Sequence, residues 1–370
     1  MANLKKLIIH PGFHKTGTTA LQQALSEVRH ELHEADFNYP HIAGNAHHRA
    51  AWSVIEKTWG WKKRGGRLLA PIEFQKLESK LKSSKSTSII SSEFFSEADP
   101  TQLAGMAKRL SGFDVQVIFT WRPLPFMLAS SYQQYLKYGV KKSYAEWLES
   151  IFEVPGEAKF TPSFWKRNLH NDVVSHWAET FGAENVSLIA VDESNPDYLY
   201  ETFAELAGIP KGILKEPSHM EMNRSLTFTE AALLLEINRT YPKDLDWDSY
   251  EIFIRKGNIK ALTRSDKHDP NDEKILTPEW AIAKAAELNL QNVAKIKSLG
   301  IKVIGNLDRN DFSKIPMGLN TPVTSISIET VARAMIGVDM SSLHKMHGKA
   351  ISKEFFHRLK KIVKARLHLN

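Results

Sequence analysis

A short apolar segment at residues 4–10 is followed at once by a Pro-Gly pair and then by a helical pattern that begins near Thr16. The apolar run is typical of a short buried strand, and the Pro-Gly pair ends it. Later apolar runs, each followed by a stretch with helical spacing, predict further strands at residues 87–91, 115–120 and 186–191. This alternation predicts a three-layer α/β fold, with a central parallel sheet flanked by helices on both faces.

Two regions depart from this simple alternation. The insert at residues 39–67 carries paired histidines, three tryptophans and a Gly-Gly, and is too irregular to be only a crossover. Such inserts commonly carry specificity. After the fourth strand the chain is predicted to be mainly helical, and the clearest helices lie at residues 226–240 and 278–298, before a late strand at 301–304.

The end of the chain has a different composition. We place a domain boundary after residue 314, so that residues 1–314 form the main domain and residues 315–370 a helical, basic extension. Residues 352–369 have apolar side chains along one helical stripe and lysines largely elsewhere. A helix of this kind can lie on an anionic membrane, but more often it packs on its own domain or on a second subunit, which we favour.

Composition limits the chemistry. None of the 370 residues is a cysteine, which excludes disulfides, thiolate metal sites and thiol nucleophiles. The apolar run near the N-terminus is too short for a signal peptide, and we expect a cytoplasmic protein. A formal net charge of +7 favours anionic partners, although only weakly.

The residues that join the first strand to the first helix form the most informative motif. Residues 11–19 read Pro-Gly-Phe-His-Lys-Thr-Gly-Thr-Thr. Glycines let the backbone bend around an anion, successive N–H groups form a nest, and the helix adds its positive dipole end. A turn without a ligand is the alternative. The residues predicted to bind are Gly12, His14, Lys15, Thr16, Gly17, Thr18 and Thr19.

The position of the lysine separates two kinds of phosphate loop. A nucleotide-triphosphate P-loop has its lysine directly after the second glycine, whereas here Thr18 follows Gly17 and Lys15 precedes it by two residues. This order argues against a kinase or an ATPase. Residues 15–19, Lys-Thr-Gly-Thr-Thr, resemble the 5′-phosphosulfate loop of sulfotransferases that use 3′-phosphoadenosine-5′-phosphosulfate (PAPS).

The resemblance implies a second signature, an arginine at the end of a later strand and a serine eight residues on, which grip the 3′-phosphate. Arg122 lies just beyond the strand at 115–120, and Ser130 is eight residues later. The planar guanidinium suits this task because it can make bidentate, charge-assisted bonds to phosphate oxygens. Other segments look like those of bacterial sulfotransferase-domain proteins distantly related to the glycan sulfotransferases: residues 90–93, Phe164 and Trp165 with Trp177, and residues 303–307.

The resemblance, which covers residues 4–312, implies a PAPS-dependent transferase. Such an enzyme moves a sulfuryl group to a hydroxyl or an amine and leaves 3′-phosphoadenosine-5′-phosphate (PAP). The acceptor could be a glycan, a lipid or a small molecule; no nucleic acid is expected, and an oligomer is compatible with the sequence. In-line transfer between oxygens relies on positioning and charge, and so requires no metal. A P-loop nucleotide kinase and a non-catalytic nucleotide-binding protein remain as alternatives.

The resemblance also implies catalytic roles. Lys15 would stabilise charge on the leaving phosphate, and Glu93, after the strand at 87–91, would be the base. Glu93 could instead simply start a helix that Ser92 caps. His47 and His48 in the insert are the rival bases.

Two further features have weaker functional interpretations. His14 lies inside the loop, and we expect its ring to be mainly structural. Arg-Lys-Gly at residues 255–257 resembles a 3′-phosphate motif of the cytosolic small-molecule sulfotransferases, but its neighbours do not match that branch. A charged helix end is the favoured explanation there.

Overall fold

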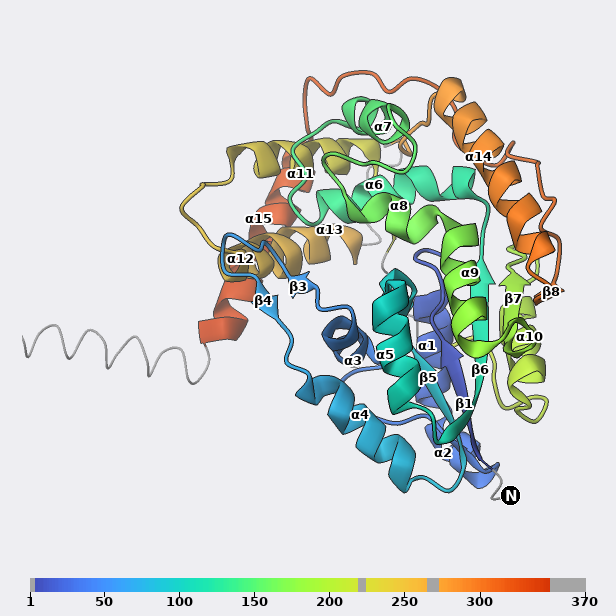
Figure 1. Ribbon diagram of the computed structural model, residues 1–370. Helices are drawn as coiled ribbons and strands as arrows, with labels where there is room; N and C mark the ends of the chain where they lie inside the picture. The colour runs from blue at the N-terminus through green and yellow to red at the C-terminus, as the bar shows by residue number, and fades with distance from the viewer. Residues whose placement is uncertain (1–3, 219–223, 265–272, 347–370) are drawn as a thin grey trace, which may run out of the picture.

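The computed structural model describes residues 4–218, 224–264 and 273–346. Its centre is a six-stranded sheet in which every pairing of neighbouring strands is parallel (Figure 1). In spatial order the strands are β2 (Phe37–Asn38), β5 (Thr87–Ser91), β1 (Lys5–His10), β6 (Phe113–Trp121), β7 (Val186–Ala190) and β8 (Lys302–Ile304). The predicted α/β class with a central parallel sheet is confirmed.

Helices cover both faces of this sheet because successive strand residues point to opposite sides. In β1, Leu7 and Ile9 belong to one buried cluster and Ile8 to another. The first cluster includes side chains of α3 (His48–Val54), α4 (Ile72–Ser83), α5 (Pro100–Arg109), α9 (His170–Phe181) and α14 (Glu279–Ser298). The second includes α1 (Thr18–Glu27), α2 (Arg29–Glu34) and α10 (Tyr198–Ala207). The three predicted layers are therefore present.

Capping residues fix where several helices begin. Asp99 and Gln102 form a reciprocal capping box at the start of α5, where Pro100 is the first helical residue. The same box, made by a hydroxyl residue and a glutamate three positions later, starts α7 (Tyr144–Phe152) and α11 (Phe228–Thr240). These starts are local properties of the sequence.

A second, mainly helical core lies beyond the C-terminal ends of the strands (Figure 1). Its elements include η2 (Leu124–Met127), α6 (Leu128–Leu136), α7, α8 (Ser163–Asn168), α11, α12 (Trp247–Tyr250), the π-helix η4 (Glu251–Ile259) and α13 (Lys260–Thr263). The insert contributes the small hairpin of β3 (Thr58–Trp59) and β4 (Arg67–Leu68). Trp61 of this hairpin contacts the rings of Trp247 and Tyr250, so the insert is part of this helical core.

Helix α15 (Ile328–Met346) packs against η4 and α13. The backbones approach closely at Gly257 and Gly337, where a Cβ atom on Gly337 would lie 2.6 Å from the carbonyl oxygen of Gly257. Helix α15 confirms that the region after residue 315 is helical, and the basic stripe predicted at residues 352–369 lies outside the described residues. The boundary after residue 314 stays a prediction. Within the described ranges, no helix has both the length and the apolar character needed to cross a membrane.

Candidate active site

The loop between β1 and α1 has an unusual backbone. Gly12, Lys15 and Gly17 all have positive φ angles, of 55°, 67° and 86°. A Cβ atom at Gly12 would lie 2.5 Å from the side chain of Thr18, so glycine is required there. A lysine in the left-handed region stores strain, which is common at ligand-binding sites. The backbone N–H groups of residues 14–19 donate no backbone hydrogen bond to any described residue and are available to an anion.

Side chains beneath the loop hold its shape. The buried Thr16 hydroxyl donates to the carbonyl of Phe13 (2.7 Å) and contacts the hydroxyl of Thr120 at the end of β6 (2.7 Å). Because that hydroxyl is already used, the backbone N–H is the group that Thr16 can offer a ligand. Thr18 is buried and Thr19 is exposed, so the two threonines of the predicted motif have different surroundings.

Lys15 extends from this loop toward α6. Its Nζ donates to Oε1 of Gln134 (3.4 Å), one helical turn after Ser130. Burial lowers the pKa of Lys15, and the negative charge of Glu93 opposes this shift without cancelling it. The Lys15 ammonium therefore lies beside the amide of Gln134 and near the carboxylate of Glu93. The resemblance implies that this ammonium stabilises charge on the leaving phosphate.

Arg122 connects the two predicted cofactor motifs. Nη1 donates to the carbonyl oxygen of Lys15 (3.0 Å), and Nη2 pairs with the carboxylate of Glu193. Nε is buried and has no hydrogen-bond partner among the described residues. A buried N–H without a partner costs free energy, which an anionic ligand at this position would offset. The Ser130 hydroxyl donates its proton to the carbonyl of Met127 in η2 (3.0 Å), so it must turn away from that carbonyl to donate to a ligand.

A second arginine lies at the same carboxylate. Nη2 of Arg309 is 3.9 Å from Glu193, and its guanidinium lies over the ring of Phe126 at 4.4 Å. Arg309 follows β8, far from Arg122 in the sequence. Two guanidinium groups that share one carboxylate leave a net positive charge at this position.

The two candidate bases lie side by side. Nδ1 of His48 is 3.7 Å from Oε2 of Glu93 and 2.9 Å from the hydroxyl of Ser92. Gln22 of α1 donates to the same oxygen of Glu93 (3.1 Å). Burial opposes ionisation of Glu93, but His48, His14 and this amide together bring its pKa below the ordinary value. Glu93 is therefore an ionised carboxylate at neutral pH that can accept a proton.

The capping alternative for this segment also occurs. Ser92 is the N-cap of the short 3₁₀ helix η1 (Glu93–Glu97) and accepts from the N–H of Phe94. Capping and base chemistry do not conflict, because the serine makes the cap and the glutamate side chain points to His48 and Gln22.

His47 has a different environment from His48. Its Nε2 donates to the carbonyl of Pro40 (2.8 Å), and its Nδ1 accepts from the N–H of Ser91 (3.0 Å). Burial lowers its pKa to about 4. Both ring nitrogens are used by the backbone, which favours a structural role.

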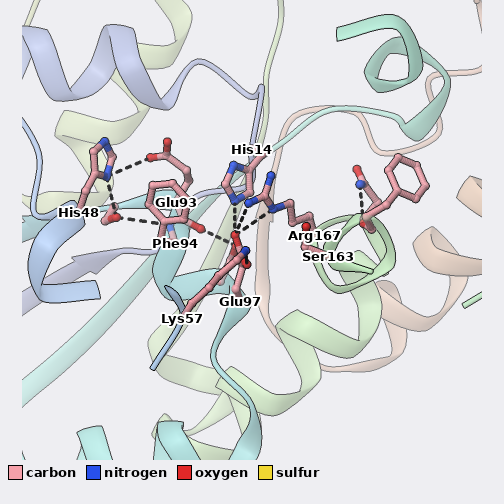
Figure 2. A network of polar contacts seen from close by, with 12 residues as sticks. His14, His48, Lys57, Glu93, Phe94, Glu97, Ser163 and Arg167 are labelled. Atoms are coloured by element: carbon pink, nitrogen blue, oxygen red, sulfur yellow. Dashed lines mark hydrogen bonds and ion pairs between the residues drawn. The ribbon is translucent and has the colours of Figure 1, made fainter. Parts of the chain in front are cut away.

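His14 belongs to a buried ionic cluster around Glu97. Figure 2 shows His14, Lys57 and Arg167 directed at that carboxylate, with Glu93 and His48 nearby. His14 donates from Nε2 (3.1 Å) and Arg167 from Nε (2.9 Å). Burial lowers the pKa of His14 to about 4, and the charge of Arg167 acts in the same direction. The expected structural role of His14 fits this geometry, because its side chain ties the loop to η1.

Sequence reasoning missed several groups at this site. Gln22, Gln134, Glu193 and Arg309 belong to no motif, and Glu97 was not singled out. Only Gln134 had a signal, because its spacing from Ser130 puts both on one helical face. Arg255, for which a charged helix end was favoured, lies within the π-helix η4, and its guanidinium lies over the rings of Trp59, Tyr138 and Trp247 at 4.4–5.4 Å.

No protein-family model and no curated protein matches this chain significantly. Among solved structures, the chain is similar to a sulfotransferase from Alicyclobacillus acidocaldarius, with 16% sequence identity and a TM-score of 0.43. The match covers 58% of this chain and 85% of that one. What this site can bind must follow from its own geometry.

Proposed function

We propose that this protein is a sulfotransferase that moves a sulfuryl group from PAPS to a hydroxyl or amine of an acceptor. One observation carries the proposal: a hydrogen bond at the carbonyl of Lys15 joins the loop to the Arg122 guanidinium, and within the described part of the chain the loop N–H groups donate no backbone hydrogen bond and the Arg122 Nε has no partner. Two anion sites held this close suit a ligand with a negative group at each end. PAPS has a phosphosulfate at one end and a 3′-phosphate at the other.

The residues fit this donor in their chemistry. The backbone of residues 14–19 would receive the phosphosulfate, and Arg122 with Ser130 would receive the 3′-phosphate after Arg122 exchanges Glu193 for it. Arg309 would add a second guanidinium to that phosphate. Each contact replaces water or a carboxylate by a charge-assisted bond to phosphate oxygen.

The proposed reaction uses three side chains near one another. Glu93, or the adjacent His48, takes the proton of the acceptor hydroxyl as its oxygen forms a bond to sulfur. The bond between sulfur and the bridging phosphate oxygen breaks, and Lys15 stabilises the charge that develops on that oxygen. Positioning and charge stabilisation then supply most of the rate enhancement.

Thermal unfolding with candidate nucleotides tests the proposal. PAP should raise the unfolding midpoint without added metal, and a chelator should leave that shift unchanged, because a ligand of the folded state stabilises by mass action. ATP and GTP with Mg²⁺ test the kinase alternative. A larger shift from ATP with Mg²⁺ than from PAP would overturn the sulfotransferase proposal. PAP binding without PAPS turnover on a wide acceptor panel would support the non-catalytic alternative.

A further inference from the structure

Lys137 lies next to the proposed reaction centre, at the C-terminal end of α6. Along this helix, Ser130 belongs to the proposed 3′-phosphate site and Gln134 contacts the Lys15 ammonium. Lys137 is three residues beyond Gln134, a rise of about 4.5 Å. The helix therefore orders three positions: the 3′-phosphate end of the donor, the transferred group, and then Lys137 on the far side of that group.

The charges that act on Lys137 among the described residues are positive. Burial, together with the charges of Lys15, Arg255 and Arg224, lowers its pKa to about 8. Its ammonium makes no hydrogen bond or ion pair with any described residue. By contrast, Lys15 has Glu93 nearby, which raises its pKa.

The two neighbouring arginines differ in how their positive charge is compensated. Arg224 is bound by both carboxylate oxygens of the buried Glu230, at 2.6 and 2.7 Å. Arg255 lies 4.4 Å from the ring centre of Tyr138, the residue after Lys137, and also over Trp59 and Trp247. A cation with an aromatic partner is stabilised but not neutralised. The cluster therefore keeps an excess of positive charge beside apolar ring faces.

We propose that Lys137 and Arg255 form an anion-binding subsite for the acceptor, so that the acceptor carries a carboxylate, sulfate or phosphate close to the hydroxyl or amine that is sulfated. This inference rests on the proposed function. The bound anion relieves the repulsion among Lys137, Lys15 and Arg255 and gains charge-assisted bonds in a half-buried place. The half-buried rings of Trp59 and Tyr138 lie beside the same position, whereas Trp247 is fully buried.

Calorimetry on the PAP-loaded protein tests this subsite with ligands that differ by one carboxylate. Phenyl β-D-glucuronide is compared with phenyl β-D-glucoside, and 4-hydroxyphenylacetate with 4-hydroxyphenylacetamide. The variants are Lys137→Met, the conservative Lys137→Arg, and Lys141→Met, which removes an exposed lysine four residues away. PAP affinity is measured for each variant first.

At least one carboxylate ligand should bind about 10-fold or more tightly than its neutral partner, the effect expected of a charge-assisted contact. Lys137→Met should abolish this preference, and Lys137→Arg and Lys141→Met should keep it, while all three variants bind PAP with wild-type affinity. Equal binding within both pairs would overturn the subsite, and so would a loss of PAP affinity in Lys137→Met equal to the loss of preference, since Lys137 would then serve the donor. Failure of the wild-type protein to bind PAP at all is a separate result, which counts against the proposed function.

Discussion

Glu93, the proposed base, accepts a hydrogen bond from Gln22 and lies 3.7 Å from His48. Glu93→Gln keeps the size of the side chain and removes its basicity. We expect turnover of PAPS to fall roughly 10²- to 10⁴-fold with little change in PAP affinity. Lys15→Ala should lower turnover as well, but with a measurable loss of PAP affinity. Steady-state kinetics and calorimetry on both variants separate the two roles.

The control for this pair is His48→Ala. If Glu93→Gln keeps near-normal turnover and His48→Ala abolishes it, then the histidine is the base and the glutamate only orients it. His47→Ala tests the structural role of His47, because that ring bonds two backbone groups. Its loss should lower the stability of the protein and should have no separate effect on turnover.

Substitutions at the two partners of the Arg122–Glu193 ion pair should change PAP affinity in opposite directions. Arg122→Ala should weaken PAP binding by about 1.5–3 kcal/mol, the usual loss for a hydrogen bond to a charged group. Glu193→Gln should strengthen PAP binding, because the 3′-phosphate no longer competes with a carboxylate for the guanidinium. Calorimetry with PAP and with adenosine 5′-phosphate measures both effects. Equal changes for the two nucleotides would mean that Arg122 acts on the fold and not on the 3′-phosphate.

At the scale of single residues, the sequence predicts the parts of the site that lie in contiguous motifs. Residues 11–19, Arg122 and Glu93 each come just after the end of a strand, so the sequence could predict that they lie at the same end of the parallel sheet. Glu193 and Arg309 could not be predicted from the sequence, because each lies in a loop after a different strand. Only the fold brings them together beside Arg122.

The 3₁₀ helix η1 is the element that binds several segments together through Glu97. This carboxylate pairs with His14 of the first loop, Lys57 of the insert and Arg167 of α8. The charges of Arg167 and Lys57 and the hydrogen bond from His14 hold the pKa of Glu97 well below the ordinary value, although burial alone would raise it. Glu97→Gln should destabilise the protein by about 3–5 kcal/mol, because it leaves a buried arginine without its counter-charge.

Chemical denaturation measures this loss, with Glu201→Gln on the exposed surface of α10 as the matched control. A change below about 1 kcal/mol in Glu97→Gln would show that water, and not the Glu97 carboxylate, compensates the charges of Lys57 and Arg167. The cluster would then have no role in holding the insert and α8 to the loop.

Elements with a strong local signal were predicted well. The helix predicted at 278–298 is α14 (Glu279–Ser298), and the strand at 87–91 is β5 with the same bounds. Strand β2 was missed because two residues give no alternation. The π-helix η4 was missed because its widened turn has no distinct residue pattern; it is followed by α13 and covered by α15.

Three buried histidines and the half-buried His14 should make the folded protein less stable in acid. Burial lowers the pKa of His10, His14 and His47 to about 4 and of His170 to about 3. Between these values and about 6.5, the unfolded chain binds more protons than the folded protein, so stability rises with pH across that window and is lost on acidification. Four groups give a slope of up to about 5 kcal/mol per pH unit near pH 5.

Denaturant titrations at pH 7, 6 and 5 measure this slope. His170 has no hydrogen-bond partner among the described residues and lies against the ring of Phe13. His170→Phe should therefore lower the number of protons taken up on unfolding by about one, and the slope in proportion. A wild-type stability that is flat between pH 7 and 5 would mean that these rings are protonated within the fold.

The order of the central strands sets where the proposed site residues begin. Glu93, Lys15 and Arg122 follow β5, β1 and β6, which are consecutive neighbours; β5 and β1 end level with each other, and β6 continues further, to Trp121. Adjacent strands are about 4.8 Å apart, so under the proposed function the groups for proton acceptance, sulfuryl transfer and 3′-phosphate recognition come from three separate strands in a fixed order. The insert enters between β2 and β5, next to the strand that carries the proposed base. We therefore expect residues 39–67 to change in length and sequence during evolution, and the acceptor with them, while the spacing of the three strands is kept.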